Sequence, residues 1–172
     1  KEDSQNSTVQ AQTATGYDKI ACVAWNLSTN PYFMKKLNDV LPKKGGCKPV
    51  VDILCLVEIH RNYPSLNRHT ESLWDTIRLK LPGGKYRVRR IVVKNLEELK
   101  NAVRTARIVV SSYGVNTLHV GDYVSQMSGT VLLKPPLDHV RFDPYVFDQH
   151  SVITYKADMS DLSAVIEDTF AR

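Results

Sequence analysis

The sequence predicts a single α/β domain built on a Rossmann-like, mostly parallel sheet with helices on both faces. Two observations carry this prediction. Short apolar runs typical of strands alternate, from residue 20 onward, with stretches whose apolar residues recur at helical spacing. One run, residues 50–59, is almost continuously apolar, as expected of a strand covered on both faces in a parallel sheet. Such alternation implies right-handed strand–helix–strand units.

The first part of the chain is expected to hold a tail, a strand and a helix. Residues 1–15 are polar and aperiodic, which predicts a flexible tail before a domain over residues 16–172. The first strand is predicted over residues 20–25. A helix should follow Asn30-Pro31, because proline is favourable in a first turn. One face of that helix would carry Phe33, Met34, Leu37 and Leu41.

Two further helices flank the third predicted strand. Asn67 is expected to cap the first of them. The strand, residues 86–93, should lie near a sheet edge, because arginine and valine alternate in it. Asn95 and Glu98 resemble a capping box for the next helix. The apolar faces would carry Leu73, Trp74, Ile77 and Leu81 in the first helix, and Leu96, Leu99, Val103 and Ala106 in the second.

The fourth strand is predicted over residues 107–112. A short helix should cover residues 119–128 and end at Gly129, since glycine is favoured at a helix C-terminus. The fifth strand, residues 130–133, is followed by two prolines that cannot continue it.

The C-terminal segment is expected to close the fold. Residues 137–150 are loop-like, and residues 151–155 form a sixth short apolar run. Ser160 or Asp158 could cap a last helix. Its apolar residues would be Leu162, Val165, Ile166 and Phe170.

Binding residues are sought at the carboxyl ends of the strands, where sheets of this class bind ligands. Arg61 follows the strand at residues 50–59, and Arg68 lies near the start of the next helix. The planar donor fork of arginine suits phosphate oxygens, and a helix N-terminus adds partial positive charge. These residues predict a diphosphate site, with a pair of solvent-facing arginines as the alternative.

A second candidate loop follows the fourth strand. Ser112, Tyr113 and Gly114 form a turn in which small residues let backbone N–H groups approach an anion. The alternative is an ordinary strand-to-helix turn, because the sequence has neither a G-x-G-x-x-G nor a Walker pattern.

The sequence shows no motif for a serine hydrolase or for a metal site. No G-x-S-x-G segment is present, and neither the three cysteines nor the five histidines have the spacing of metal ligands. We therefore expect no metal or cofactor, and the sequence names no catalytic residue.

The net charge of +5 permits anionic partners. Basic residues concentrate within residues 78–107, but no aromatic side chains interleave with Arg87, Arg89 and Arg90 as in an RNA-binding sheet. A solvated basic face is therefore favoured over nucleic-acid binding. No apolar run approaches the roughly 20 residues of a spanning helix, so no transmembrane segment is expected.

The C-terminal third carries a set of short motifs. They are Ser112-Tyr113-Gly114, Asp122-Tyr123, Gly129 to Lys134-Pro135, Asp138-His139, Thr154-Tyr155 and Asp158 to Leu162. Over residues 107–165 this pattern resembles the carboxy-terminal, donor-binding half of GT-B glycosyltransferases of the group 1 type and of related protein glucosyltransferases.

The resemblance implies a sugar-nucleotide site and hexosyl transfer without a metal, with a second GT-B domain or partner subunits completing the enzyme. Ser112 and Gly114 would face the donor phosphates, and the helix from Asp122 would face the ribose or sugar. The donor-binding residues implied are Arg61, Arg68, Ser112, Tyr113, Gly114, Asp122, Tyr123 and Lys134. The resemblance and two glycosylation sequons, at Asn6 and Asn26, also suggest the secretory pathway or Golgi lumen.

Two departures from the family pattern support an alternative. Gly121 stands where the family has arginine, and Val124 where it has a glutamate that contacts donor hydroxyls. Valine cannot accept a hydrogen bond. This predicts a catalytically weakened relative, or a non-catalytic structural or interaction subunit of a larger assembly.

Overall fold

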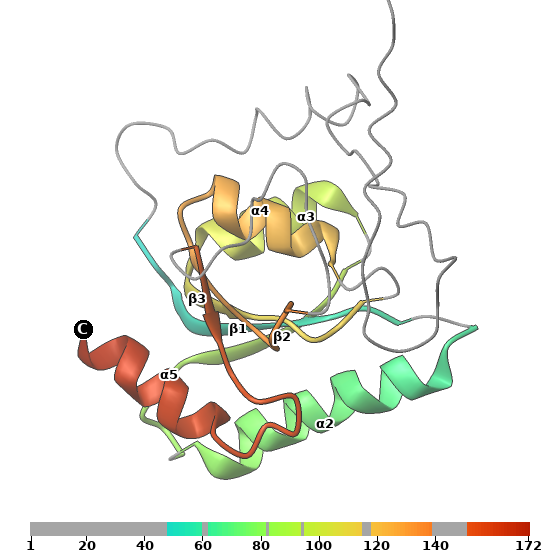
Figure 1. Ribbon diagram of the computed structural model, residues 1–172. Coiled ribbons are helices and arrows are strands. Elements are labelled where there is room, and N and C mark those ends of the chain that lie inside the picture. The colour runs from blue at the N-terminus through green and yellow to red at the C-terminus, as the bar shows by residue number, and fades with distance from the viewer. Residues whose placement is uncertain (1–47, 60–61, 82, 94, 115–117, 139–150) are drawn as a thin grey trace, which may run out of the picture.

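Parallel strands form a single sheet in the computed structural model, which describes residues 48–59, 62–81, 83–93, 95–114, 118–138 and 151–172. Five strands are present in these residues, in the order β2-β1-β3-β4-β5, and every neighbouring pair is parallel. Their bounds are β1 Val51–Val57, β2 Val88–Val92, β3 Ala106–Val110, β4 Val131–Lys134 and β5 Val152–Thr154. The predicted Rossmann-like α/β class is confirmed (Figure 1).

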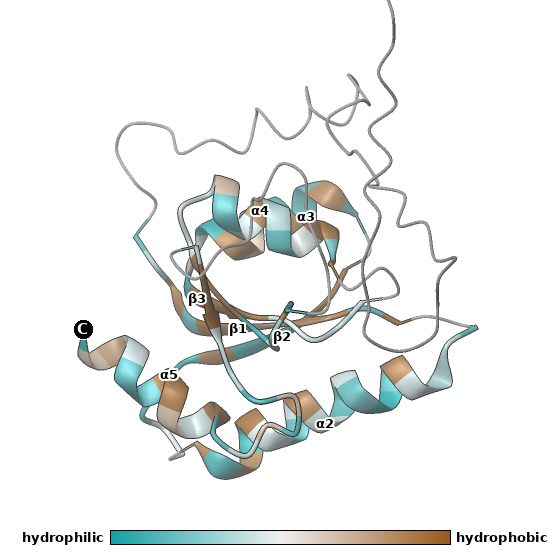
Figure 2. Ribbon diagram, viewed as in Figure 1, coloured by the Kyte–Doolittle hydropathy of each residue, from teal (hydrophilic) through white to brown (hydrophobic). Residues whose placement is uncertain are grey.

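Helices cover both faces of the sheet. Helices α3 and α4 lie on one face, and α2 and α5 lie on the other (Figure 1). Their bounds are α2 Pro64–Lys80, α3 Leu96–Arg104, α4 Val120–Met127 and α5 Leu162–Ala171. Figure 2 shows brown, hydrophobic stretches along the strands and on parts of each helix.

The side chains of β1 divide alternately between two apolar clusters. Leu54 and Leu56 belong to the cluster beneath α3 and α4, whereas Ile53, Cys55 and Val57 belong to the one above α2 and α5. All five side chains are buried. Alternation between two covered faces is the geometric reason for the continuous apolar run that predicted this strand.

Several local predictions are confirmed. Strand β2 lies at the sheet edge. The side chain of Asn95 accepts a hydrogen bond of 2.8 Å from the backbone N–H of Glu98, which satisfies one of the free donors at the start of α3. Gly129 follows α4 with φ +69°, a conformation that favours glycine.

Most element boundaries differ from the predictions by one or a few residues, and three of the differences change the role of a named residue. Helix α2 begins at Pro64, one turn before Asn67, because proline sits in the first turn and Tyr63 takes the N-cap position. Ala106 opens β3 instead of ending α3, which stops at Arg104. Helix α5 begins at Leu162 with Asp161 in the N-cap position.

Asp158, one of the two residues expected to cap α5, bonds within the preceding turn, as does the observed N-cap residue Asp161. The Asp158 carboxylate accepts a hydrogen bond from the backbone N–H of Ser160, and the Asp161 carboxylate accepts one from Lys156. The predicted tail, the strand at residues 20–25 and the helix after Asn30-Pro31 lie outside the described residues.

Candidate functional site

The strand order identifies one place where a ligand could bind at the carboxyl edge of the sheet. The chain passes from β1 to β2 on one side and then crosses to β3 on the other side of β1. The connections that leave β1 and β3 therefore run in opposite directions and open a crevice at their carboxyl ends. The residues next to this switch point are 58–59 and 62–63 after β1, and 111–114 after β3.

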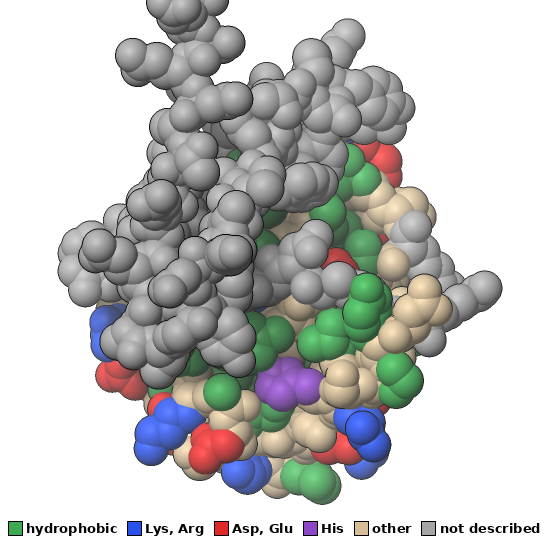
Figure 3. Space-filling model, turned by 45° about the vertical axis from the view of Figure 1, so that its right-hand side comes forward, with side chains coloured by type: hydrophobic (Ala, Val, Ile, Leu, Met, Phe, Trp, Pro, Cys, Tyr) green, Lys and Arg blue, Asp and Glu red, His purple; other side chains and the backbone are tan. Residues whose placement is uncertain are grey.

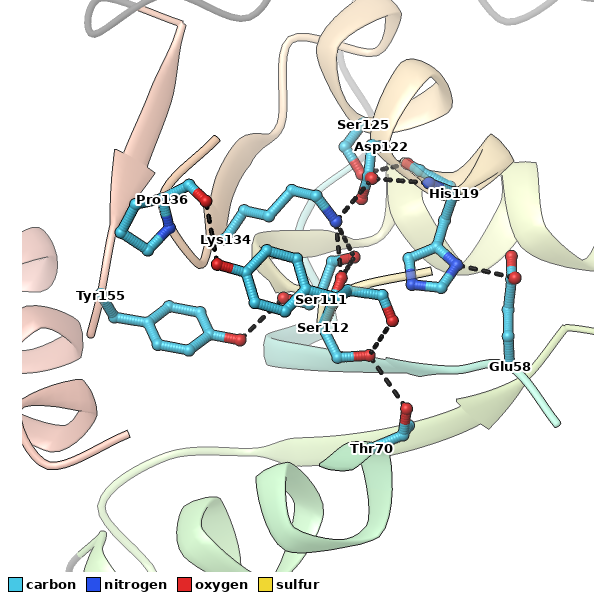
Figure 4. A network of polar contacts seen from close by, with 12 residues as sticks. Glu58, Thr70, Ser111, Ser112, His119, Asp122, Ser125, Lys134, Pro136 and Tyr155 are labelled. Carbon is cyan, nitrogen blue, oxygen red and sulfur yellow. Dashed lines mark hydrogen bonds and ion pairs between the residues drawn. The ribbon is translucent and has the colours of Figure 1, made fainter. Parts of the chain in front are cut away.

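The segment after β3 is fixed by side chains from three other elements (Figure 4). The Lys134 ammonium donates to the carbonyl of Ser112 at 2.5 Å and to the hydroxyl of Ser111 at 3.4 Å. The Tyr155 hydroxyl donates to the Ser111 carbonyl at 2.8 Å, and the hydroxyls of Thr70 and Ser112 lie 2.9 Å apart. We call residues 111–114 the β3 loop; its conformation is determined by the surrounding fold.

Tyr113 adds a further tie at the outer side of the loop. Its hydroxyl donates to the carbonyl of Pro136 at 2.9 Å, and its ring lies 5.7 Å from the ring of His69 on α2. Burial, with a smaller contribution from the Asp138 carboxylate, raises the pKa of this hydroxyl. The side chain remains half-buried, so part of it borders the crevice.

Lys134 and Asp122 form a fully buried ion pair beside the loop. Their charged atoms are 2.9 Å apart, and neither side chain is exposed. The ammonium has three donors, and Asp122, the Ser112 carbonyl and the Ser111 hydroxyl supply three acceptors. The same oxygen of Asp122 accepts from the backbone N–H of His119 at 2.8 Å. The pair thus joins the end of β4, the β3 loop and the start of α4.

Glu58 and His119 form a second polar pair, at the end of β1. The Oε2 atom of Glu58 lies 2.7 Å from Nδ1 of His119. The imidazole is 3% exposed, while the glutamate side chain is 22% exposed. Gly114 packs against the ring so closely that a Cβ there would lie 2.8–2.9 Å from two imidazole atoms. Glycine is therefore the residue that permits this contact.

The structure brings together five of the eight predicted site residues. Ser112, Tyr113 and Gly114 belong to the β3 loop, and Asp122 and Lys134 contact each other beneath it. Because both charged side chains are fully buried, they act on the loop and not on solvent.

Two of the other three predicted residues, Arg68 and Tyr123, lie apart from this network. Arg68 is exposed on α2. Tyr123 is half-buried against the apolar cluster beneath α3 and α4. Burial first and the Asp122 carboxylate second raise the pKa of its hydroxyl. Arg61 lies outside the described residues.

The two departures from the glycosyltransferase pattern have a packing explanation. A Cβ at position 121 would lie 2.4 Å from Cδ1 of Leu56. Val124 has no exposed surface and belongs to the apolar cluster between α4 and the sheet. Neither position faces a crevice, so Gly121 and Val124 do not support the interpretation of lost donor contacts.

Sequence reasoning missed four residues of the network: Glu58, Thr70, His119 and Tyr155. One signal could have found the first of them. Glu58 is the charged residue directly after the apolar run of β1, at the end of the strand where ligands bind in this fold. The others are recruited from distant segments, and no spacing rule connects them.

Several of the basic residues within 78–107 form ion pairs with acidic neighbours. Arg87 contacts Asp52 at 3.0 Å, Lys85 contacts Glu167 at 2.9 Å, and two further pairs are Arg78–Asp75 and Arg90–Glu71. Figure 3 shows blue and red side chains next to each other along the lower rim of this view. This pairing agrees with a solvated charged face and gives no support to a nucleic-acid site.

A shallow hollow of about 390 Å³ lies at the opposite, amino-terminal edge of the sheet. Asp52 of β1, Arg107 of β3 and Phe170 of α5 line it. Asp52 is held by Arg87, and the Arg107 guanidinium lies 4.5 Å above the Phe170 ring. The charged side chains that line this hollow are thus mainly engaged with neighbouring side chains. The switch point therefore remains the candidate site.

Within the described residues, no three or more His, Cys, Asp or Glu side chains gather as metal ligands would. Burial raises the pKa of Cys55 to about 12, so this thiol stays protonated at neutral pH. Among the helices of the described ranges, none combines the length and apolarity of a membrane crossing.

The strand order and the helices on both faces define a doubly wound α/β protein whose switch point lies between β1 and β3. Comparison with models of protein families, with curated proteins and with solved structures gives no match.

Proposed function

We propose that this chain is a donor-binding domain of glycosyltransferase type, which holds a sugar nucleotide at the carboxyl edge of its sheet. The observation that carries the proposal is the fixed β3 loop at the switch point. Ser111 and Ser112 are tied by Lys134, Tyr155 and Thr70 before any ligand arrives. A loop whose backbone is already ordered loses little conformational entropy on binding, which favours affinity.

The start of α2 supports a diphosphate position beside that loop. Tyr63 provides no side-chain cap, and the first turn holds no acidic residue, so no carboxylate offsets the positive end of the helix dipole there. Arg68 follows on the same helix with an exposed side chain. The ring contact between Tyr113 and His69 joins α2 to the β3 loop at this point. Arg61 remains a proposed second contact.

The buried groups have a positioning role in this proposal. Lys134 and Asp122 would hold the β3 loop in place, and Ser112, Tyr113 and Gly114 would border the donor. Transfer to an acceptor would require a second GT-B domain or a partner subunit. The alternative function, a non-catalytic interaction subunit, predicts the same fold without nucleotide binding.

The test is a thermal-shift titration of the chain with UDP-, GDP- and ADP-sugars. A ligand at a hundredfold excess over Kd adds about 2.7 kcal/mol to the free energy of unfolding. We expect one nucleotide class to raise the melting temperature of the native chain.

A matched pair of variants on α2 localises the site. Arg68→Gln should reduce the shift, whereas Arg78→Gln, an exposed arginine paired with Asp75 near the other end of the helix, should not. A cooperative melt without a shift for any nucleotide sugar would contradict the proposal and favour the interaction subunit.

A further inference from the structure

The end of β1 presents a carboxylate at the switch point. Glu58 is the first residue after the strand, and β1 is one of the two strands between which the crevice opens. Its side chain is partly exposed, whereas the imidazole that it contacts is buried. The Glu58 side chain is therefore partly accessible to solvent while it contacts a buried imidazole.

His119 holds this carboxylate in a defined place. Its backbone N–H is bonded to Asp122, and Gly114 lies directly against its ring. Asp122 is in turn held by the buried ammonium of Lys134. Figure 4 shows Glu58 pointing toward His119 at one end of this chain of contacts. The position of Glu58 is thus coupled to the fixed β3 loop.

The charge of Glu58 restricts what can lie beside it. A carboxylate repels phosphate oxygens, so the diphosphate is directed away from the end of β1 and toward the start of α2, whose first turn holds no acidic residue. Carboxylate oxygens accept hydrogen bonds from hydroxyl groups, and the two oxygens together can accept from both hydroxyls of a vicinal diol. A neutral sugar ring carries no charge that Glu58 would repel, and it offers a vicinal diol.

We propose that Glu58, positioned by His119, accepts hydrogen bonds from a vicinal diol of the ligand and thereby orients it in the crevice. This inference rests on the proposed function and extends it with a specificity-determining residue. The diol belongs either to the ribose of the nucleotide or to the transferred hexose. Both present the same chemistry, and the test separates them.

The experiment compares the full native chain with Glu58→Gln against four probes. The probes are UDP, 2′-deoxy-UDP, UDP-glucose and inorganic pyrophosphate, with GDP or ADP counterparts if the first titration selects another base. Binding is measured by calorimetry, and the melting temperature reports the fold of each variant. A hydrogen bond to a charged group contributes enough affinity that its loss should cost about tenfold in Kd.

Two outcomes support the inference. If Glu58 holds the ribose, the native chain prefers UDP over 2′-deoxy-UDP by about tenfold, and Glu58→Gln abolishes that preference. If it holds the hexose, the substitution weakens UDP-glucose and leaves UDP unchanged. Glu58→Asp retains the charge but shortens the reach by one methylene group, and it should have an intermediate effect.

Two other outcomes overturn it. If Glu58→Gln leaves the affinity for every probe unchanged, or changes the affinities for all four probes by the same factor, then Glu58 does not recognise a diol. Glu71→Gln, which removes a carboxylate from an ion pair with Arg90, is the matched control and should leave every probe unaffected. If the native chain binds no nucleotide at all, the proposed function fails, and this inference fails with it.

Discussion

The ammonium of Lys134 lies 2.9 Å from the carboxylate of Asp122, and both side chains are completely buried. Taking two charges out of water is costly, and in such a place each charge depends on its partner for stabilisation. The pair links β4 to α4 and, through the Ser112 carbonyl, to the β3 loop. It therefore couples the candidate site to the core.

Removing one partner should be costly. Lys134→Met leaves the Asp122 carboxylate buried without its cation and should lower the free energy of unfolding by about 3–5 kcal/mol. Urea denaturation measures the loss. The double variant Lys134→Met/Asp122→Leu should lose less than the sum of the two single variants, since no unpaired charge remains.

An exposed pair gives the control for that experiment. Lys85→Met removes the ion pair between Lys85 and Glu167, both of which are about half exposed. This substitution should leave the urea midpoint nearly unchanged. Equal losses for Lys85→Met and Lys134→Met would contradict the importance assigned to burial.

Placing glutamate at position 124 should destabilise the protein instead of improving nucleotide binding. Val124 has no exposed surface, and a carboxylate among its apolar neighbours would have no partner. We expect Val124→Glu to cost more than about 3 kcal/mol, and Val124→Ala to cost less. Thermal or urea unfolding measures both. A stable Val124→Glu variant with raised affinity for a sugar nucleotide would show that the position faces the ligand.

Glycine substitutions offer a matched comparison. Gly114→Ala should displace the His119 ring and weaken its contact with Glu58, because the new Cβ would lie within 2.9 Å of two imidazole atoms. Gly83→Ala is the control, since no atom lies within 4 Å of a Cβ there and its φ is not positive. We expect Gly114→Ala to lower the melting temperature. Gly83→Ala should leave it unchanged or raise it slightly. Equal melting temperatures would show that the His119 contact can relax freely.

The ion pair between Asp52 and Arg87 should make stability depend on pH in the acid range. The hydrogen bond from the Arg87 side chain is the main reason that the pKa of Asp52 lies below its usual value of 3.8. A lowered pKa adds stability above pH 3.8, and this stability is lost as the pH falls through the folded-state pKa. Arg87→Gln should therefore be less stable than the native chain at pH 7 but not at the lowest pH. A difference between the two that persists unchanged below pH 2 would contradict this assignment.

Cys55 should resist alkylation until the protein unfolds. Its thiol is buried and has a pKa of about 12, so almost no thiolate exists at pH 8. Peptide mapping after iodoacetamide treatment should show Cys55 modified in urea and unmodified in buffer. Modification at equal rates in both conditions would mean that this part of the sheet opens readily.

Local signals in the sequence identified most of the described elements because each depends on neighbouring residues. The apolar run of β1, the Asn95 cap and the glycine after α4 are of this kind. The predicted cap of α2 at Asn67 is wrong, because the helix starts at Pro64, and proline in a first turn is itself a helix-starting signal. Ala106 continues the helical spacing of α3 although it begins the next strand, so periodicity alone could not locate that boundary.

The candidate site was less predictable for a physical reason. Its polar contacts join residues that are far apart in sequence, such as Thr70 and Ser112 or Glu58 and His119. No spacing rule encodes such pairs, because they depend on which strands become neighbours. The rule that ligands bind at the carboxyl ends of strands located the β3 loop, but it did not distinguish a contacting side chain from a supporting one. Lys134 and Asp122 are implied as donor contacts by the family resemblance and not by this rule, and both side chains are fully buried.

The ties between the β3 loop and the interior also determine how the protein can open. A loop held by a buried ammonium, a buried tyrosine hydroxyl and a helix threonine cannot detach by itself, because each tie ends on an element of the core. The amide hydrogen of Ser111, which is bonded to the Leu133 carbonyl, should therefore exchange with solvent as slowly as those of β1. Entry of a ligand would then leave this side of the crevice rigid, and any movement that accompanies binding would have to come from the facing wall.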